Sequence, residues 1–371
     1  MRLDQSLATV PNREAAGGRT NRRLMPALAV AALLVVACSS PGAGSPSAAA
    51  PSAGGASPSS AASPAGSVAL WQPEQPINMV VPFAAGGPTD TVTRLVADPM
   101  GATLGQQIVV QNVAGAGGTL AAGQVATAAP DGYTVLMHHI GMSTAPALYP
   151  KLSYDPQKDF KPIGLVTNVP MTIIGKKDLP PKTLEELTAY VKANSKKVTL
   201  ANAGTGAASQ LCGLLIEQAM DVDLTEVPYD GTGPALTDLV GGQVDFMCDQ
   251  TTNTAGQIKA GKVQAYAVTT PERVEAFKDL PTTAEAGLPD VEVGVWHGLY
   301  VPKDTPDDVV KKLTDALATA LKDQNVVTKM ADLGTAPVPA DQVTPEAHAK
   351  KLTEQIALWG PIIKDAGIKS D

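Results

Sequence analysis

The sequence predicts an α/β protein that is large enough for two domains. From residue 77 onward, short β-branched runs alternate with segments whose apolar residues recur three and four positions apart. Such alternation is typical of parallel sheets flanked by helices. The chain has 371 residues, of which 44% are hydrophobic, so it is long enough to bury two cores.

The first 37 residues read as an export signal. Arg22 and Arg23 precede an apolar run, residues 24–37, that ends in the small residues before Cys38. At about 14 residues, this run is shorter than the roughly 20 that a helix needs to cross a bilayer. The sequence VVAC at 35–38 resembles a bacterial lipobox, which would make Cys38 the lipidated first residue. A plain secretory signal, an uncleaved anchor and twin-arginine export stay open as alternatives.

The segment that follows the signal contains only Ala, Gly, Pro and Ser, from residue 39 to residue 67. This composition cannot bury a core and behaves as a flexible tether. Its end-to-end distance is on the order of 30 Å when coiled and up to about 90 Å when extended by proline. We therefore expect residues 38–70 to tether the folded part to a membrane surface.

The exported part is acidic. The whole chain has 28 Lys and Arg against 36 Asp and Glu; without residues 1–37 the numbers are 23 and 34, a net charge of −11. Nucleic acid is not expected as a partner of so acidic a body. With Cys38 lipidated, Cys212 and Cys248 remain, and their spacing does not decide between a disulfide and two buried thiols.

Eight strands and seven helices are predicted in the body. The strands are expected at residues 77–81, 108–111, 133–137, 163–166, 171–174, 198–201, 225–227 and 263–268. The helices are expected at 90–104, 120–128, 184–194, 209–220, 236–240, 306–322 and 345–366, the last two covering a sheet formed earlier. Asp90, after Pro88 and Thr89, is read as an N-cap of the first helix.

Three glycine-rich turns each join a strand to a helix: AAGG at 84–87, GAGG at 115–118 and GTG at 204–206. Their side chains are too small to fill space, so the backbone itself is expected to face a ligand. A helix N-terminus carries free N–H groups and about half a positive charge, which suits a carboxylate or phosphate. Each turn taken alone is equally compatible with a tight connection.

The glycine turns do not match nucleotide-binding loops. Leu120 and Ser209 stand where a GxGxxG fingerprint needs its last glycine, and no GxxxxGK[ST] occurs. No cofactor is therefore predicted.

Asp230, Asp245 and Asp249 could be imagined as a general acid and base. They follow turns or end strands, however, where acids are ordinary.

No catalytic or metal site is predicted either. His138 and His139 are neighbours on a strand and point to opposite faces, so they cannot jointly hold a metal without a bend. His297 and His348 stand alone, and no GxSxG or HExxH motif is present.

A series of short motifs runs through the body in a fixed order. They are VPFAAGGPTD (81–90), Asn112 with GAGG (115–118), APDGYT (129–134), YDP (154–156), KDF (158–160), ANAG (201–204), VPY (227–229), DLVGGQVD (238–245), IKAGK (258–262), WG (359–360) and AGI (366–368). Together they resemble the solute-binding proteins of tripartite tricarboxylate transporters, also called the Bug or TctC family. The resemblance spans nearly the whole exported body.

The resemblance implies the type 2 periplasmic binding protein fold, with two α/β domains and a hinged ligand cleft. Domain 1 would comprise residues 71–168 and 296–371, and domain 2 residues 169–295. The two hinge crossings would lie near 166–171 and 293–298.

The resemblance also implies a set of ligand contacts. From the first domain these are Phe83, Ala84, Ala85, Gly86, Gly87 and Asp90. From the second they are Ala203, Gly204, Thr205, Gly206, Ser209 and Asp249. Residues 138–143 depart from the small polar residues common in relatives, so His139 and Ser143 are added at the cleft mouth, and a ligand bulkier or less polar than citrate is expected.

An acidic body cannot attract a carboxylate by its net charge, so neutral dipoles are expected to hold it. The donors would be the N–H groups of Gly86 and Gly87 and the helix start at Asp90, with bridging water. If Asp90 faces the cleft instead of capping the helix, it would favour a ligand with an amino or hydroxyl donor.

The expected function is an extracytoplasmic, lipid-anchored, monomeric binding protein. By resemblance, it captures a small carboxylate and delivers it to the large and small membrane subunits of a tripartite tricarboxylate transporter. The first alternative is a ligand sensor that signals to a membrane kinase. The second is a secreted α/β enzyme with a Gly-rich cofactor loop, which would need a nucleophile or metal that the sequence does not offer.

Overall fold

The computed structural model describes residues 70–369. The predicted export signal, the lipidation site Cys38 and nearly all of the tether lie outside the described residues. The predictions made for them therefore stay predictions.

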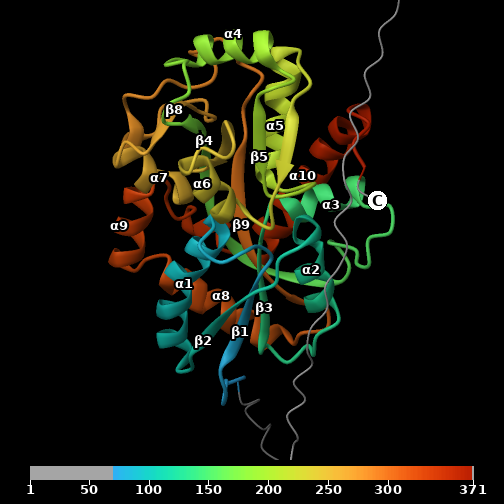
Figure 1. The fold of residues 1–371 in the computed structure, drawn as a ribbon. Helices are drawn as coiled ribbons and strands as arrows, with labels where there is room; N and C mark the ends of the chain where they lie inside the picture. Colours follow the sequence, from blue (N-terminus) through green and yellow to red (C-terminus); the bar gives the residue numbers. More distant parts are fainter. Residues whose placement is uncertain (1–69, 370–371) are drawn as a thin grey trace, which may run out of the picture. The chain divides into compact units, whose positions relative to one another are not determined.

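Helices and strands alternate along the described chain (Figure 1). In order, the elements are β1 (Ile77–Val81), α1 (Pro88–Leu104), β2 (Ile108–Asn112), η1 (Ala116–Gly118), α2 (Thr119–Ala126), β3 (Thr134–His139), α3 (Gly141–Leu148), β4 (Phe160–Lys176), α4 (Leu184–Asn194), β5 (Thr199–Asn202), α5 (Ala208–Met220), β6 (Thr225–Pro228), α6 (Thr232–Val240), β7 (Phe246–Gln250), α7 (Thr251–Lys259), β8 (Val263–Val268), η2 (Glu275–Phe277), β9 (Gly294–Pro302), α8 (Asp307–Ala320), α9 (Gln324–Asp332), η3 (Ala340–Gln342) and α10 (Pro345–Asp365).

The strands form one mixed sheet in the order β2-β1-β3-β9-β4-β7-β5-β6, with β8 also paired to β4. β1 is parallel to β2 and β3, and β5 is parallel to β6 and β7. β9 is antiparallel to β3 and β4, and β4 is antiparallel to β7 and β8. The parallel pairing that the alternation predicts is therefore found in two groups of strands, and the antiparallel strands β4 and β9, which were not foreseen as such, join these groups.

The long strand β4 divides the described chain into two lobes. Its first part, from Phe160 to Pro170, pairs with β9, and its second part, from Met171 to Lys176, pairs with β7 and β8. We call β1, β2, β3, β9 and the first part of β4, with α1, α2, α3, α8 and α10, lobe A. Lobe B comprises the second part of β4 and β5 to β8, with α4 to α7. The two predicted crossings lie side by side, since Asn168 pairs with Trp296 in β9.

Helices cover both faces of the strands, as the alternation of side chains along each strand requires. Ile77 and Met79 of β1 pack with Val92 of α1 in one core. Val80, the residue after Met79, belongs to the core on the opposite face. Of the C-terminal helices, α8 packs on α1 and β4, and α10 packs on α3 and β4. Within the described residues, no helix is both long enough and apolar enough to span a bilayer.

Some predicted elements differ from those in the structure. The two strands predicted at 163–166 and 171–174 are one strand, β4, because Thr167 to Pro170 continue the pairing with β9. β7, β9, α3, α7 and α9 were not predicted. The ends of α8 and α10 lie within two residues of those predicted.

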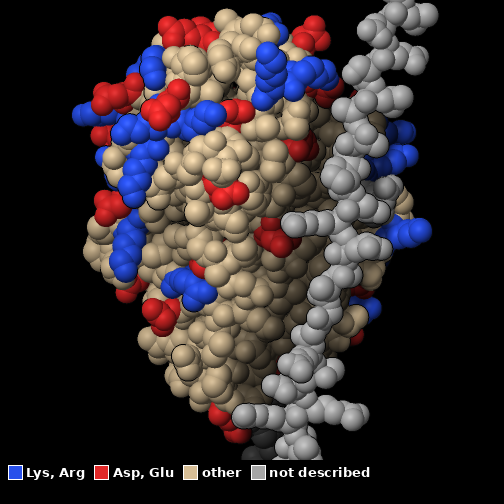
Figure 2. Space-filling view, viewed as in Figure 1, with Lys and Arg blue, Asp and Glu red and all other residues tan. Residues whose placement is uncertain are grey.

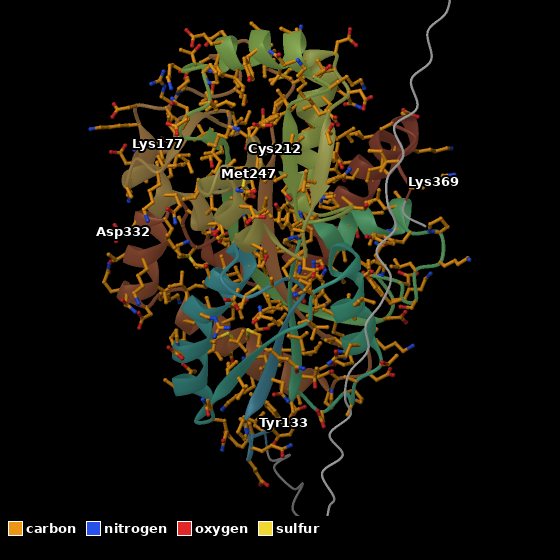
Figure 3. The ribbon with its side chains drawn as sticks, viewed as in Figure 1. Tyr133, Lys177, Cys212, Met247, Asp332 and Lys369 are labelled. Carbon is orange, nitrogen blue, oxygen red and sulfur yellow. A yellow bond between two sulfur atoms is a disulfide. The ribbon has the colours of Figure 1, made fainter. Side chains whose placement is uncertain are left out.

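Cys212 and Cys248 form a disulfide that joins α5 to β7 inside lobe B, with their Cα atoms 6.1 Å apart. Figure 3 labels Cys212 close to Met247 in this lobe. The disulfide alternative, which the spacing had left open, is therefore the one that the structure contains.

Candidate binding site between the lobes

A small cavity lies where the two lobes meet. Lobe A lines it with Phe83, Pro88, Thr89 and His139; lobe B lines it with Ala203, Ala207, Ala208, Ser209, Thr232, Asp249 and Gln250. All of these residues are buried. The volume is about 20 Å³, which holds roughly one water molecule.

Four helices begin at the cavity. Pro88 and Thr89 are the first residues of α1, and Ala208 and Thr232 are the first residues of α5 and α6. Gln250 is the N-cap of α7. The first N–H groups of a helix have no partner within the helix, and its N-terminus carries about half a positive charge. These N-termini therefore contribute partial positive charge at the cavity, and no Lys or Arg is among its lining residues, which include the acid Asp249.

A larger groove, of about 580 Å³, adjoins the cavity. Phe83 and Ala203 line both spaces. The rest of the groove is formed by Gly115, Ala116, Gly117, Tyr149, Gly204, Thr205, Pro228, Tyr229, Asp230 and Pro234. It is thus bounded by the second and third glycine turns and by two tyrosines.

Direct hydrogen bonds hold the lobes together around these spaces. The N–H of Ala84 donates to the carbonyl of Asp230 (3.1 Å), and the Tyr149 hydroxyl donates to the carbonyl of Thr205 (2.7 Å). A Cβ at Gly117 would lie 2.0 Å from the carbonyl oxygen of Thr205. Glycine at this position therefore lets the two backbones meet, and the structure describes the lobes in a closed arrangement.

Asp90 is buried and fully paired in lobe A. Its Oδ2 accepts hydrogen bonds from the N–H of Gly86 and from Nε of Arg94, both at 2.9 Å. Its Oδ1 accepts from Arg94 (2.9 Å) and from the amide of Asn112 (3.0 Å). Burial alone raises the pKa of Asp90, but the hydrogen bonds from Arg94, Gly86 and Asn112 outweigh burial and leave the pKa below its usual value.

The interpretation of Asp90 as an N-cap is wrong. The N-cap of α1 is Gly87, and Asp90 is the third residue of the helix, from where it reaches back to Gly86. Asp90 does not line the cavity, and the N–H of Gly86 is occupied by the Asp90 carboxylate.

Asp249 in lobe B differs from Asp90 because one of its carboxylate oxygens has no hydrogen-bond partner among the described residues. It is 1% exposed and ends β7 at the wall of the cavity. Asn253 donates to its Oδ2 at 2.5 Å, whereas Oδ1 has no hydrogen-bond partner among the described residues. Burial raises the pKa of the Asp249 carboxyl to about 6, against the hydrogen bond from Asn253. The neighbouring side-chain oxygen of Gln250 is also unpartnered among the described residues.

A neutral aromatic wall faces Asp249 from lobe A. The ring of His139 stacks on Phe83 at a centroid distance of 4.8 Å, and the ring of His297 lies 5.7 Å from His139. The N–H of Gly141 donates to Nδ1 of His139, so the proton of the neutral ring is on Nε2. Burial lowers the pKa of His297 to about 3 and that of His139 well below its usual value. The wall therefore carries no charge at neutral pH.

Half of the predicted contact residues, seven of fourteen, line one of the two spaces. The cavity is lined by Phe83, His139, Ala203, Ser209 and Asp249, and the groove also by Gly204 and Thr205. The others do not line either space: Ala84, Ala85, Gly86, Gly87, Asp90, Ser143 and Gly206. The hydroxyl of Ser143 donates to the carbonyl of Ile140, and the carbonyl of Gly206 accepts from Thr144 of lobe A.

Six of the residues that line the cavity were not predicted as ligand contacts: Pro88, Thr89, Ala207, Ala208, Thr232 and Gln250. Pro88 and Thr89 lie inside the first motif, and a reading of the whole helix start would have included them. Thr232 lies four residues before the predicted start of α6, and Gln250 precedes a helix that was not predicted.

Comparison with known proteins relates the chain to a family and to solved structures. The model of the tripartite tricarboxylate transporter family receptor, TctC, matches residues 92–368. The chain is similar to the periplasmic binding protein BugD, with 52% identity, a TM-score of 0.79, and coverage of 80% of this chain and 100% of that one.

Two further solved structures contain an acid. MatC from Rhodopseudomonas palustris with bound malate is 45% identical, with a TM-score of 0.76 and coverage of 78% of this chain and 99% of that one. A second R. palustris protein, solved with adipate, is 31% identical, with a TM-score of 0.76 and coverage of 80% and 99%. The fold is therefore that of these periplasmic binding proteins, with two α/β domains around a ligand cleft.

Proposed function

Since the chain belongs to the tripartite tricarboxylate transporter receptor family, we propose that it captures a small carboxylate between lobes A and B and delivers it to such a transporter. The family consists of periplasmic solute-binding proteins and not of enzymes. The bound malate of MatC and the adipate of the second R. palustris protein support a small dicarboxylic acid as the ligand class.

One observation carries this proposal: the residues at the starts of four helices line one cavity, and helix N-termini supply partial positive charge and N–H donors to anions. A hydrogen bond to a charged acceptor contributes roughly 1.5 to 3 kcal/mol. A few such bonds therefore suffice for micromolar affinity, which needs about 8 kcal/mol. The face in Figure 2 shows acidic and basic side chains interspersed, so the attraction is local to the cavity.

Ligand entry requires the lobes to separate. The closed cavity holds roughly one water molecule, which is too little for a dicarboxylate. We propose that the acid binds while the lobes are apart, that one carboxylate occupies the cavity, and that the rest of the ligand extends into the adjoining groove. The paired segments of β4 and β9 between the lobes serve as the hinge, with the domain boundaries near residues 168 and 295.

The remaining parts of the proposal concern residues outside the described chain. Lipidation of Cys38 would anchor the protein outside the cytoplasm, and the Ala/Ser/Pro/Gly tether would let the folded part reach the large and small membrane subunits as a monomer. Closure around the ligand is the change that these subunits would detect.

A thermal-shift screen of carboxylic acids on the purified protein tests the proposal. A ligand at 100 times its dissociation constant stabilises by about 2.7 kcal/mol, which corresponds to a rise in melting temperature of about 5 °C for a body of this size. We expect malate, succinate or adipate to give such a shift and to be recovered chemically unchanged. The absence of a shift with any carboxylic acid, or the appearance of a product, would contradict the proposal.

A further inference from the structure

We propose that each ligand anion is captured together with one proton, held between Asp249 and the ligand carboxylate. This inference rests on the proposed function and adds a coupling to it. Three observations carry it: Asp249 is almost completely buried, its Oδ1 has no partner among the described residues, and it forms part of the cavity wall.

The place of Asp249 in the cavity wall brings it close to the ligand. A carboxylate that enters this narrow space between the lobes lies beside the Asp249 side chain, which is one of the groups that line it. Two carboxylates that share a water-excluded site cannot both be ionised, and one of them takes up a proton. The proton then satisfies the open Oδ1 of Asp249 and forms a charge-assisted O–H···O bond to the ligand.

No cation near Asp249 can replace that proton. Lys176 of β4 pairs with Asp245 at the other end of β7, and Lys259, at the far end of α7, donates to the carbonyl of Asp332. Arg94 of α1 pairs with Asp90. These three cationic side chains therefore bind other groups and do not neutralise a second carboxylate at Asp249.

The other titratable groups on the surrounding elements are acidic or neutral. Glu217 of α5 accepts a hydrogen bond from the N–H of Leu224, and Asp238 of α6 accepts one from the hydroxyl of Tyr229. His139 of β3, which lines the cavity, and His297 of β9 are held neutral by burial. The proton therefore comes from solvent.

The direction of the pH dependence follows from the two states of the protein. The pKa of the free Asp249 carboxyl is about 6, so at pH 7.5 the free protein is mostly ionised at this residue. In the complex the ligand carboxylate raises that pKa further, so binding takes up close to one proton. Affinity is then highest below pH 6 and weakens about tenfold per pH unit between pH 7 and the pKa of the complex.

Isothermal titration calorimetry in buffers of different ionisation enthalpy measures the protons taken up per ligand bound. Succinate, malate and adipate are the probes, at pH 7.5 and constant ionic strength. For each acid that binds, we expect uptake of 0.7 to 1 proton, on the order of one per site. Asp249→Asn, which cannot titrate, is expected to bind with uptake near zero and with less than a threefold change between pH 6.5 and 8.

The control is Asp98→Asn, an equal change of charge at an exposed position of α1, which should retain the uptake. Binding of these acids to the wild type without proton uptake would overturn the inference, since Asp249 would then stay ionised beside the ligand. Uptake that persists in Asp249→Asn would overturn it as well. Failure of every acid to bind would instead contradict the proposed function. The wild-type buffer series decides the question even if Asp249→Asn does not fold.

Discussion

Two buried aspartates, one in each lobe, have opposite environments. Asp90 at the start of α1 accepts hydrogen bonds from Gly86, Arg94 and Asn112, and its pKa is lowered. For Asp249, near the end of β7, burial outweighs the hydrogen bonds, of which that from Asn253 is the largest, and raises the pKa to about 6. A buried acid is therefore structural when its oxygens are satisfied, and it is available for function when one of them is not.

Asp90→Ala is expected to have the largest effect on stability. It removes the charged acceptor of the hydrogen bonds from the N–H of Gly86, the amide of Asn112 and the guanidinium of Arg94, which together cost about 4 kcal/mol of unfolding free energy. Because the folded pKa is lowered, this contribution is present above the ordinary value of 3.8 and fades as the pH falls below it. Urea denaturation at pH 7 and pH 3 measures both effects, with Asp98→Ala as control. Loss of binding at unchanged stability would assign Asp90 to the ligand instead.

Removal of the disulfide tests how firmly lobe B holds Asp249, which directly follows Cys248. The disulfide closes a separation of 36 residues, and its loss in Cys212→Ala/Cys248→Ala is expected to cost about 3 kcal/mol of unfolding free energy. Reduction of the wild type should match the double variant in denaturation experiments. Equal stability of the reduced and oxidised proteins would show that packing alone fixes α5 against β7.

Asp249→Asn is expected to act in the opposite direction from Asp90→Ala. The difference between a pKa of about 6 and the ordinary 3.8 corresponds to about 3 kcal/mol lost by the wild type as the pH rises from 4 to above 6. The variant should therefore be up to about 3 kcal/mol more stable than the wild type at pH 7.5 and nearly equal to it at pH 4. Denaturation curves at the two pH values check this. A destabilised variant at pH 7.5 would mean that Asp249 has a stabilising partner.

Gly117→Ala is expected to give the smallest effect on folding but a clear one on binding. The new Cβ would meet the Thr205 carbonyl of lobe B and hinder closure, so the affinity for malate should fall at least about tenfold, or 1.4 kcal/mol. Gly105→Ala has a similar positive φ, of 74° against 60°, but no atom within 4 Å of the new Cβ. It controls for backbone strain. Equal affinities of the two variants would show that closure at this point does not matter.

Much of the fold was predictable from the sequence. Strands such as Ile77–Val81 and Val263–Val268 are mostly apolar runs, and α4 begins and ends where its apolar spacing does. β9 was missed because Gly294, His297 and Gly298 interrupt its apolar pattern, and α7 was missed because it is polar around most of its surface. The break predicted in β4 rests on Asn168 and Pro170, which tertiary pairing with β9 overrides.

The sequence predicted which turns lie at the candidate site, but it did not predict which of their groups are free to contact a ligand. The glycine turns at 84–87 and 204–206 lie beside the cavity, as the strand-turn-helix order indicated. Which N–H groups stay free depends on partners from other elements, such as Asp230 for Ala84. Asp90 and Arg94 stand four residues apart, so their ion pair was visible in the sequence. The lack of a partner for Oδ1 of Asp249 could not be predicted from the sequence, because it depends on the side chains that pack around β7.

A crystal structure of the complex with malate tests the central claim most directly, which is that helix N-termini hold the acid without a cationic side chain. The account predicts one carboxylate between the N-termini of α1 and α5, within hydrogen-bond distance of Asp249, with no Lys or Arg nitrogen within 4 Å. A carboxylate paired with a lysine or arginine, or a malate bound outside the space between the lobes, would contradict it.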